Sequence, residues 1–382
     1  MKLNKWFVTA LFITVIFTSI CADLSAQPYT RKDYMIPDIP GYITVKCDFH
    51  MHTIFSDGAV WPTVRVEEAW MEGLDAIATS DHIENHPNKK GVSLPDRNLV
   101  HEIAREKGDE LNMICINGAE ITRDMPPGHL NAIFLKDVNP LDTPKWRDAI
   151  KAAIDQGAFV FWNHPGWRQP NNIPIWYDEH TEIFENGWMH GMEVVNGYDY
   201  YPLAHQWCLD KKITMLANSD VHAPISFNVD FEKGQHRPMT LVFAKERTPE
   251  GIKEALINRR TAVHHGSLLI GEEQYVRQIY EASVTFENTE LTIKGRDRGR
   301  IRVQNTSDIP FELTTSEEFE ELTIPKSTTL HGQRTVIFTI RGTHKKVRGT
   351  KEYNLNYTAK NVRLTPEQGM PVTIPIKVNF DN

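Results

Sequence analysis

Residues 42 to about 260 alternate between short apolar runs and amphipathic segments, and this alternation limits the possible folds more than any other feature. The apolar runs lie at residues 42–45, 74–79, 113–118, 158–162, 192–195, 213–217 and 239–244. The amphipathic segments between several of them lie at residues 64–71, 99–107, 146–156, 203–209 and 249–258. Strands that alternate with helices predict βα units and a largely parallel sheet. About seven such units favour closure into a barrel; the alternative is an open doubly wound sheet, for which the sequence has no glycine-rich nucleotide loop.

The pattern of apolar and polar residues changes after about residue 280. Short apolar runs are then separated by turn residues, and helical periodicity is absent. This pattern is typical of a small all-β sandwich. We therefore expect a barrel domain over residues 27–280 and a β-sandwich accessory domain over residues 281–382. The arginine-rich stretch at residues 295–300 is either a hairpin tip or a basic patch.

The first residues have the layout of a secretory signal peptide. Lys2 and Lys5 precede an apolar run at residues 6–20, and small and polar residues follow as far as Ala26. The run is shorter than the roughly 20 apolar residues that a membrane-spanning helix needs. We expect a signal peptide at residues 1–26, cleavage after Ala26, and a secreted or periplasmic protein without stable membrane insertion. The alternative is an uncleaved membrane anchor.

Charge and histidine are concentrated in the same part of the chain. Residues 27–285 hold 25 Lys and Arg against 37 Asp and Glu, a net charge of −12, and residues 286–382 hold 15 against 12, a net of +3. The acidic part also holds 14 of the 16 histidines. This combination suits metal binding and argues against a specific nucleic-acid partner. The cysteines beyond the leader (Cys47, Cys115 and Cys208) lack metal-type spacing and are too few for a disulfide framework. Cys47 and Cys115 lie in apolar strand-like runs, so we expect these two thiols to be buried.

Side chains of metal-ligand type recur where apolar runs end. The stretch CDFHMHTIFSDG carries Asp48, His50, His52 and Asp57 directly after the first run. The later members of this series are Asp81, His82, Glu120, His129, His164, Glu193, Asp220 and His222. Most of them follow their apolar run, and in a parallel barrel the carboxyl ends of the strands form the face where catalytic groups gather.

Strand alternation adds detail to this expectation. Residues two positions apart point to the same side of a strand, so Asp48, His50 and His52 would face together, away from their apolar neighbours. Two imidazoles so placed at a strand end can chelate one ion. His129 precedes its apolar run; either that strand runs in the opposite direction or a loop delivers the side chain.

The number of these residues distinguishes a metal site from ordinary structural histidines. A single histidine on a strand is usually structural, but burying many imidazoles and carboxylates in one place is costly unless cations compensate. Imidazole with carboxylate and without thiolate favours Zn, Mn or Fe over a thiolate zinc site or calcium. The plausible ligands exceed the needs of one ion, so we expect two or three divalent metal ions.

Taken in order, the motifs DFHMHT with SDG, TSDH, GAE, GHLN, NHP and SDVH resemble those of the PHP (polymerase and histidinol phosphatase) family of metal-dependent phosphoesterases. The resemblance covers roughly residues 43 to 270. It implies an α/β fold that is a distorted (β/α)7 barrel, here followed by the small β-sandwich, with a trinuclear metal site at the carboxyl ends of the strands.

The resemblance also implies a role for each candidate ligand. The first ion takes His50, His52 and Asp220, the second takes His129 and His164 with Glu120 as a bridge, and the third takes His82 and His222 with Asp57 beside them. Some family members have histidine at the position of Asp57, so the third metal could differ here. Asp48, Asp81 and Glu193 resemble groups that orient imidazoles or a bound water.

The function implied is hydrolysis of a phosphate mono- or diester of a small substrate. A metal-bridging water, with its pKa lowered toward about 7, would attack phosphorus in line. Arg123 and Arg168 follow Glu120 and His164 closely and are candidate phosphate clamps. Two alternatives remain: a metallohydrolase of a non-phosphate bond, such as an amide or lactone, on the same barrel, and a metal-binding module without activity.

Overall fold

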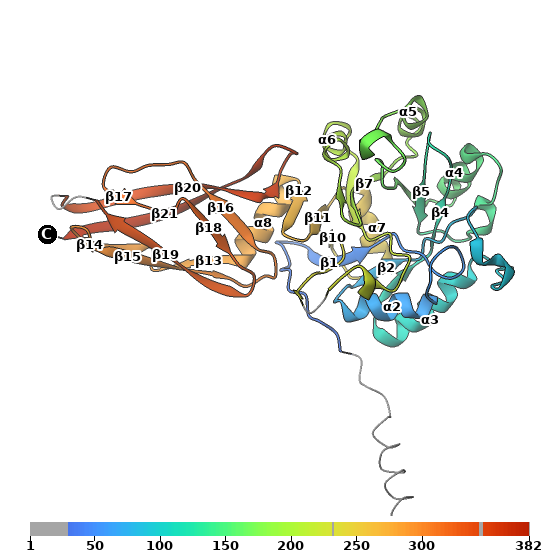
Figure 1. The fold of residues 1–382 in the computed structure, drawn as a ribbon, viewed down its shortest axis with the longest axis horizontal. Coiled ribbons are helices and arrows are strands. Elements are labelled where there is room, and N and C mark those ends of the chain that lie inside the picture. Colours follow the sequence, from blue (N-terminus) through green and yellow to red (C-terminus); the bar gives the residue numbers. More distant parts are fainter. Residues whose placement is uncertain (1–29, 231–232, 344–346, 382) are drawn as a thin grey trace, which may run out of the picture. The chain divides into compact units, whose positions relative to one another are not determined.

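The computed structural model describes residues 30–381 apart from residues 231–232 and 344–346 (Figure 1). The expected signal peptide therefore lies outside the described residues. From Asp33 onward the chain forms one compact unit. Within the described part of the chain, no helix combines the length and the apolar character needed to cross a bilayer.

Twelve strands between residues 43 and 271 fall into two hydrogen-bonded groups. The first group, in spatial order, is β12 (Leu268–Gly271), β11 (Thr261–His265), β10 (Met239–Ala244), β1 (Ile43–Asp48), β2 (Ala76–Ala78) and β3 (Ile114–Ile116). The second is β4 (Gly118–Ile121), β5 (Leu130–Ile133), β6 (Phe159–Trp162), β7 (Gly191–Asn196) and β8 (Asp199–Tyr200), with β9 (Thr214–Asn218) on β7. Each of the seven predicted apolar runs contributes to a strand.

The strands are mixed in direction, whereas the sequence predicted a largely parallel sheet. β1, β2 and β3 run parallel, as do β6, β7 and β9. β10 is antiparallel to β1, and β11 is antiparallel to both β10 and β12. β5 is antiparallel to both β4 and β6, so the strand after His129 does run in the opposite direction. The physical reason is visible in the connections: β11 and β12 are joined by the two residues Gly266 and Ser267, which only an antiparallel pair permits.

The two groups of strands meet where the site-forming side chains begin. Isolated parallel bridges join Met51 to Val221 and His82 to Glu120. The chain passes from β3 to β4 at Gly118, where a Cβ atom would lie 2.9 Å from the carbonyl oxygens of Ala132 and Thr79. Glycine is required by this close approach, which brings Glu120 beside the end of β2.

Seven helices are described, and the five predicted amphipathic segments are all among them. They are α2 (Pro62–Met71), α3 (Leu99–Leu111), α4 (Trp146–Asp155), α5 (Asp178–Glu185), α6 (Pro202–Lys211), α7 (Pro249–Ile257) and α8 (Glu273–Ser283). α2, α6 and α7 begin with proline in the first turn, where no amide donor is needed. The Thr248 hydroxyl caps α7 by accepting from the Gly251 amide at 3.0 Å. α3 ends at Asn112, which adopts a left-handed conformation.

Burial along β1 and its continuation follows the predicted alternation. Cys47, Phe49 and Met51 are fully buried, and Cys47 and Phe49 pack with apolar side chains of β2 and β10. The thiols of Cys47 and Cys208 are buried and free, and burial raises the pKa of both. Because this face is taken up by packing, the imidazoles at positions 50 and 52 are directed elsewhere.

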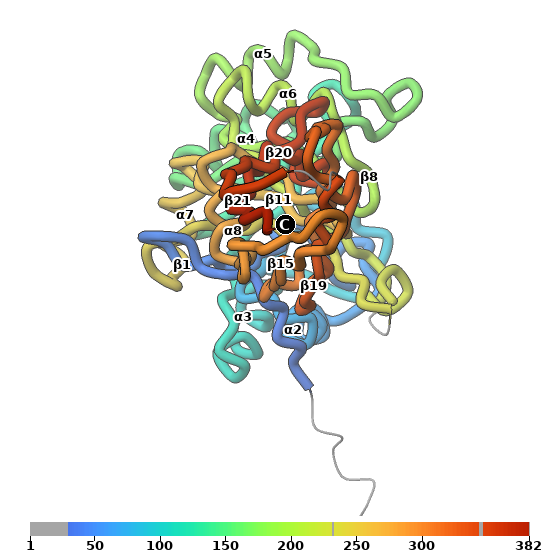
Figure 2. The backbone as a smooth tube through the Cα atoms, turned by 90° about the vertical axis from the view of Figure 1, so that its left-hand side faces the viewer, coloured from blue at the N-terminus to red at the C-terminus, as the bar shows by residue number. Residues whose placement is uncertain are grey.

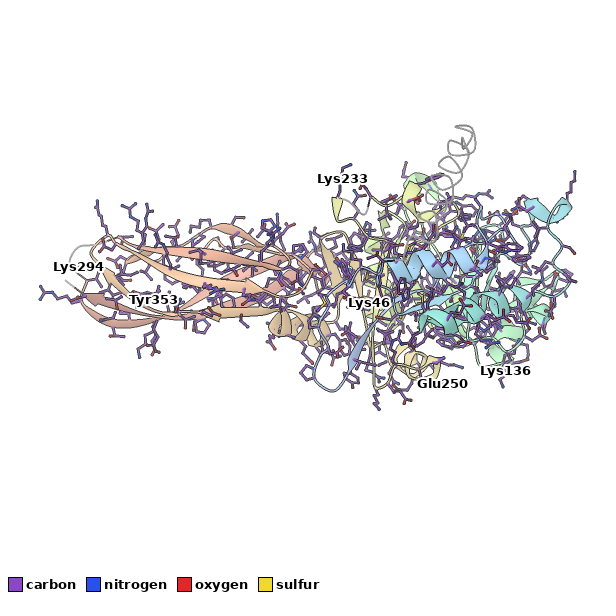
Figure 3. The ribbon with its side chains drawn as sticks, turned by 90° about the horizontal axis from the view of Figure 1, so that it is seen from below. Lys46, Lys136, Lys233, Glu250, Lys294 and Tyr353 are labelled. Carbon is purple, nitrogen blue, oxygen red and sulfur yellow. The ribbon has the colours of Figure 1, made fainter. Side chains whose placement is uncertain are left out.

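After α8 the described residues form strands joined by turns and loops, without a helix. One sheet has the order β13 (Val284–Glu287), β15 (Arg298–Asn305), β19 (Arg334–Gly342) and β17 (Leu322–Thr323). The other strands are β14 (Glu290–Lys294), β16 (Phe311–Thr314), β18 (Ser327–Leu330), β20 (Gly349–Arg363) and β21 (Gly369–Asp381). Lys294 at the end of β14 and Tyr353 on β20 mark this region in Figure 3, and Figure 2 shows its strands in orange and red. β20 pairs in parallel with β12, so these strands continue the sheet of β10 and β1.

The arginine-rich stretch forms a turn followed by the start of β15. Gly295 takes a positive φ of 57° after β14 ends at Lys294. Arg298 and Arg300 are exposed on β15, while the alternating positions Gly299 and Ile301 are buried. β14 pairs with β21 rather than with β15, so the turn crosses between sheets instead of closing a hairpin.

Adjacent positions on β19 provide a test of this packing. Phe338 is 1% exposed and Ile337 is 51% exposed. We expect Phe338→Ala to lower the free energy of unfolding by about 3–5 kcal/mol, through lost burial and the cavity left behind. The control, Ile337→Ala, should change it by roughly 0.5 kcal/mol or less. Denaturant unfolding followed by fluorescence measures both, and equal effects would contradict the assigned strand faces.

Candidate metal centre

Nine side chains of ligand type converge at the ends of β1, β2, β4, β6 and β9 and at the start of β5. They form four overlapping groups whose ligand atoms lie within 4.8 Å of one another. The groups are His52 with Asp57, His82 and His222; His50 with Glu120 and His164; His50 with His52 and Asp220; and His82 with Glu120 and His129. Every residue that the sequence indicated as a ligand is in at least one group. Four of them are shared: His50, His52, His82 and Glu120.

The spacing at the centre suits a divalent ion. His50 Nε2 lies 3.1 Å from His52 Nε2 and 3.3 Å from Glu120 Oε2. Asp220 Oδ1 lies 3.0 Å from His52 Nε2 and 3.2 Å from His50 Nε2. Ligand atoms about 2.0–2.2 Å from one tetrahedral ion are separated by roughly 3.3–3.5 Å. These four side chains are therefore arranged much as they would be around a shared cation.

Unpaired buried atoms provide a separate test of fit. Of the thirteen buried side-chain atoms without a hydrogen-bond partner among the described residues, four belong to candidate ligands: His52 Nδ1, His129 Nδ1, His164 Nδ1 and Asp57 Oδ1. Buried polar atoms are nearly always paired, so each unpaired atom needs an explanation. His129 Nδ1 lies 2.7 Å from Glu120 Oε1, yet outside hydrogen-bond geometry. Because all four atoms belong to candidate ligands, cations explain them together, and the donor set fits divalent metal ions.

Glu193 orients one of the central imidazoles. Its Oε1 lies 2.9 Å from His50 Nδ1, which leaves His50 Nε2 facing the other ligands. Glu193 also accepts from the His164 amide at 2.6 Å and from the Asn218 and Asn196 side chains at 2.9 and 2.8 Å. A carboxylate behind an imidazole is the usual way in which a ligating histidine is held in one tautomer.

Asp81 and Asp48 act on loops rather than on imidazoles. Asp81 accepts from the Thr53 amide and hydroxyl, both at 2.7 Å, and from the Ser56 hydroxyl at 2.5 Å, which fixes the loop leading to Asp57. Asp48 accepts from the Ser219 amide and hydroxyl at 3.1 and 2.5 Å, next to Asp220. The sequence had suggested that both orient imidazoles or a bound water; the hydrogen bonds described here fix the backbone that carries the ligands.

Two ligands have unusual backbone conformations. His164 and Asp220 take positive φ values of 26° and 53°. A side chain with a Cβ adopts this region at a cost, and it persists where the surroundings enforce it. Each residue lies two positions after the end of a strand, β6 for His164 and β9 for Asp220, and its conformation turns its side chain to the shared centre.

Mutual electrostatics keep the carboxylates ionised. Burial alone would raise the pKa of Glu120, but His82, His50 and His129 hold it well below the usual range. The pKa of Asp57 and that of Asp220 are likewise lowered against burial by neighbouring imidazoles. Burial lowers the pKa of His52 to about 4, so it stays neutral near pH 7. Ionised carboxylates beside a neutral imidazole are ligands in the state that binds a cation.

The centre opens into a cavity of about 850 Å³, which includes both candidate phosphate clamps in its lining. Arg123 donates to the Thr122 and Thr143 carbonyl oxygens at 2.8 and 2.7 Å and pairs with Glu84. The Arg168 side chain is 63% exposed and has only a 3.6 Å ion pair with the exposed Asp124. Its guanidinium lies 4.2 Å from the centre of the Trp167 ring. The Arg168 guanidinium is thus accessible to a ligand in the cavity, whereas the Arg123 guanidinium is occupied by two carbonyl oxygens and by Glu84 in the cavity wall.

Trp167 packs against the rings of two candidate ligands, so its ring is not free to stack on an aromatic group of a substrate. Its ring centre lies 4.4 Å from that of His129 and 5.4 Å from that of His164. With Arg168 over the ring as well, Trp167 supports both the ligands and the arginine. Tyr198 does not line this cavity; its hydroxyl donates to the Asn228 carbonyl.

Several supporting residues were missed by the sequence reasoning. Asn163 donates to Glu120 Oε1 at 3.0 Å and to Asn131 at 2.8 Å. Arg237, fully buried, pairs with Asp48 at 3.0 Å and with Glu72 at 2.5 Å. Asn163 could have been suspected from its place before His164 in the NHP motif. The sequence around Arg237 gives no comparable signal.

The fold and this site define a class: a mixed α/β protein with clustered imidazole and carboxylate ligands for divalent metal ions, joined to a sheet-rich C-terminal region. A solved two-domain protein from Bacteroides vulgatus, described as containing a predicted PHP-like metal-dependent phosphoesterase, is 44% identical to this chain. The match covers 92% of this chain and 100% of that one, with a TM-score of 0.85. The chain belongs to this PHP-like family.

Other comparisons describe parts of the chain. Residues 284–375 match a family described as an Ig-like domain. A candidate metal-dependent phosphoesterase from Bifidobacterium adolescentis is 17% identical, covering 46% of this chain and 87% of its own, with a TM-score of 0.37. An amidohydrolase from Chromobacterium violaceum is 15% identical, covering 47% and 88%, with a TM-score of 0.36. No curated protein matches the chain.

Glu120 provides the most direct test of metal binding, because it belongs to two of the four groups. We expect Glu120→Gln to lose at least one divalent ion per chain, since removing the charge weakens every ligand set that includes it. Elemental analysis of the purified, zinc-reloaded protein measures this. Glu84→Gln, which changes a carboxylate of the same cavity outside the groups, should keep the wild-type metal content. Unchanged content in Glu120→Gln would argue against the centre.

Proposed function

We propose that this protein is a metal-dependent phosphoesterase that hydrolyses a phosphate mono- or diester of a small substrate. The observation that supports this best is the sharing of ligands: the four groups overlap through His50, His52, His82 and Glu120. One ion cannot use nine side chains, whereas adjacent ions with common ligands can. The relative from Bacteroides vulgatus supports the same reaction class.

The ligand groups divide among three ions. His50, His52 and Asp220 would hold the first, and His129 and His164 the second, with Glu120 reaching both. His82, His222 and Asp57 would hold the third, with His52 alongside. Imidazole and carboxylate donors without thiolate favour Zn, Mn or Fe. When bound, such ions supply a water of lowered pKa and stabilise the charge that develops on a phosphoryl group.

The protein's own groups orient the substrate. We assign the phosphate contact to Arg168, because its side chain is exposed at the cavity and its guanidinium lies 4.2 Å over the centre of the Trp167 ring. A planar guanidinium can donate two parallel hydrogen bonds to phosphate oxygens. Arg123 would instead hold the cavity wall in shape through its carbonyl contacts. The exposed Asp124 beside Arg168 would release it when a phosphate arrives.

The proposal extends to the architecture and the location of the protein. The two groups of strands, joined by bridges beside the ligands, would form the distorted (β/α)7 barrel of residues 27–280, with residues 281–382 as the accessory domain. The basic start and apolar run support export to the periplasm or the outside, with cleavage after Ala26. The substrate would be small and phosphorylated, and nucleic acid would not be a specific partner.

The discriminating experiment is hydrolysis of p-nitrophenyl phosphate and bis-p-nitrophenyl phosphate by protein loaded with Mn²⁺, Zn²⁺ or Fe²⁺. Turnover of either ester that is abolished by chelation and restored by metal is the expected result. The ratio of the two rates gives the monoester or diester preference. If metal-loaded protein cleaves neither ester but cleaves an amide or lactone panel, the alternative hydrolase is correct. If it cleaves nothing while holding metal, the inactive module is favoured.

Arg168→Ala should lower kcat/KM for the better ester by about 10- to 100-fold. A charge-assisted hydrogen bond contributes roughly 1.5–3 kcal/mol, and this one is directed at the phosphate in our assignment. Steady-state kinetics of the metal-loaded variant, with its metal content measured in parallel, gives the result. Arg147→Ala removes an exposed arginine that pairs with Glu182 on another helix and does not line the cavity, and should leave the kinetics unchanged. Equal kinetics in both variants would remove Arg168 from the site.

A further inference from the structure

Arg65 on α2 is a fully buried arginine whose side chain hydrogen-bonds to the main chain of the candidate metal centre. Its Nε donates to the His52 carbonyl at 2.8 Å, and its Nη2 donates to the His222 carbonyl at 2.6 Å. Its Nη1 donates to the Ala223 carbonyl at 2.8 Å and pairs with Glu68 at 2.8 Å. One guanidinium thus contacts the main chain of two candidate ligands and of the residue after one of them.

The carbonyls come from two segments far apart in the sequence. His52 follows β1, and His222 and Ala223 follow β9. The segments are already joined by backbone bonds from the His52 amide to the Val221 carbonyl at 3.0 Å and from the Ala59 amide to the His222 carbonyl at 2.8 Å. The side chains of the same two residues are also in contact: the His52 and His222 rings stack with centres 4.1 Å apart. Arg65 adds side-chain hydrogen bonds that clamp the same two segments together.

The chemistry of the clamp requires arginine. The Ala59 amide donates to the His222 carbonyl, but no described backbone bond reaches the His52 or Ala223 carbonyl, so these two oxygens need side-chain donors. Only a guanidinium offers several donors in one rigid plane, and lysine cannot reach three carbonyls along fixed directions. A buried cation is costly without a counter-charge, which Glu68 supplies. Glu68 also accepts from the Ile225 amide at 2.9 Å, so it is fixed to the same loop as His222.

We propose that Arg65 is a positioning residue that sets the distance between His52 and His222 and thereby the affinity of the His52–Asp57–His82–His222 group for a divalent ion. The proposal rests on the proposed function, since it assumes that this group binds metal. Arg65 contacts no substrate and no ligand side chain; it acts through the backbone of its two histidines. Its loss should weaken binding by this group and spare the ion held by His129 and His164, to which Arg65 makes no hydrogen bond among the described residues.

The test uses full-length mature protein, stripped with a chelator and reloaded with Zn²⁺ alone. We expect Arg65→Met to bind one ion fewer per chain, or to bind that ion about 10- to 100-fold more weakly by titration calorimetry, which is the usual effect of losing a supporting group. Arg65→Lys keeps the charge with fewer directed donors and should weaken the same ion. Arg260→Met is the matched control. Arg260 is 6% exposed, donates to the Phe243 carbonyl at 3.0 Å and pairs with Glu254, away from the ligand loops.

The melting temperatures of the metal-free variants show whether a loss of metal binding comes from unfolding or from displaced ligands. All measurements are made below the lowest melting temperature, and if Arg65→Met does not fold, Arg65→Lys decides. A double variant identifies the ion: Arg65→Met with His222→Ala should bind no fewer ions than His222→Ala alone, because both act on one group. Wild-type stoichiometry and affinity in both Arg65 variants, or a further loss in the double variant, would overturn the proposal. If the wild type itself takes up no Zn²⁺, the proposed function fails instead.

Discussion

The burial of the Glu120 carboxylate is the constraint on which the rest of this structure depends. The side chain has no exposure, yet its oxygens lie within 3.6 Å of nitrogens from His50, His52, His82, His129 and His164. These imidazoles arrive from four other segments of the chain, so five segments must end at the same point. An ionised carboxylate in such a place is tolerated only with positive charge around it. Divalent cations would supply such charge between the Glu120 carboxylate and the imidazoles around it.

A cluster of this kind needs a rigid framework, and the framework here is itself polar. Glu193 fixes the His50 ring, Asp81 fixes the loop before Asp57, and Asp48 with Arg237 fixes the turn before Asp220. Each of these buried charges is paired or hydrogen-bonded, as buried polar networks must be if they are to specify one arrangement. The network acts mainly on backbone groups and so determines where strands end. The positions of the candidate ligand side chains are therefore restricted to ones in which they lie close together.

The sequence was informative where chemistry and periodicity coincide. Alternation placed His50 and His52 on one side of an extended segment and Phe49 and Met51 in the core, and the structure has both features. It also associated Asp220 with His222. The direction of β5 had remained open, because His129 precedes its strand instead of following it. Local pattern cannot determine the direction in which two strands pair, which is why the antiparallel β10 and β11 were not predicted.

Other residues were beyond sequence reasoning because their roles depend on tertiary contacts. Arg65 lies in a segment whose charged residues look like an ordinary solvated helix face, yet it is fully buried. Arg123 and Arg168 looked equivalent, each close after a candidate ligand. The structure separates them, since two carbonyls and Glu84 occupy Arg123 whereas Arg168 remains exposed at the cavity. A local sequence pattern does not show which buried carbonyl oxygens lack a backbone donor in the folded chain. A buried arginine is needed where such carbonyl oxygens gather.

The C-terminal strands contribute no ligand, but they are coupled to the centre through the main chain. β20 pairs with β12, β12 with β11, β11 with β10, and β10 with β1, whose end leads directly into His50. Asn361 adds side-chain donors to the Ser267 carbonyl at 2.6 Å and the Pro310 carbonyl at 2.8 Å, across the same junction. A continuous ladder transmits position because each pair restricts the next strand in register and tilt. The region matched to an Ig-like domain is therefore joined by hydrogen-bonded strands rather than only by a linker, and displacing it would break backbone pairs adjoining the sheet that presents the first two histidines.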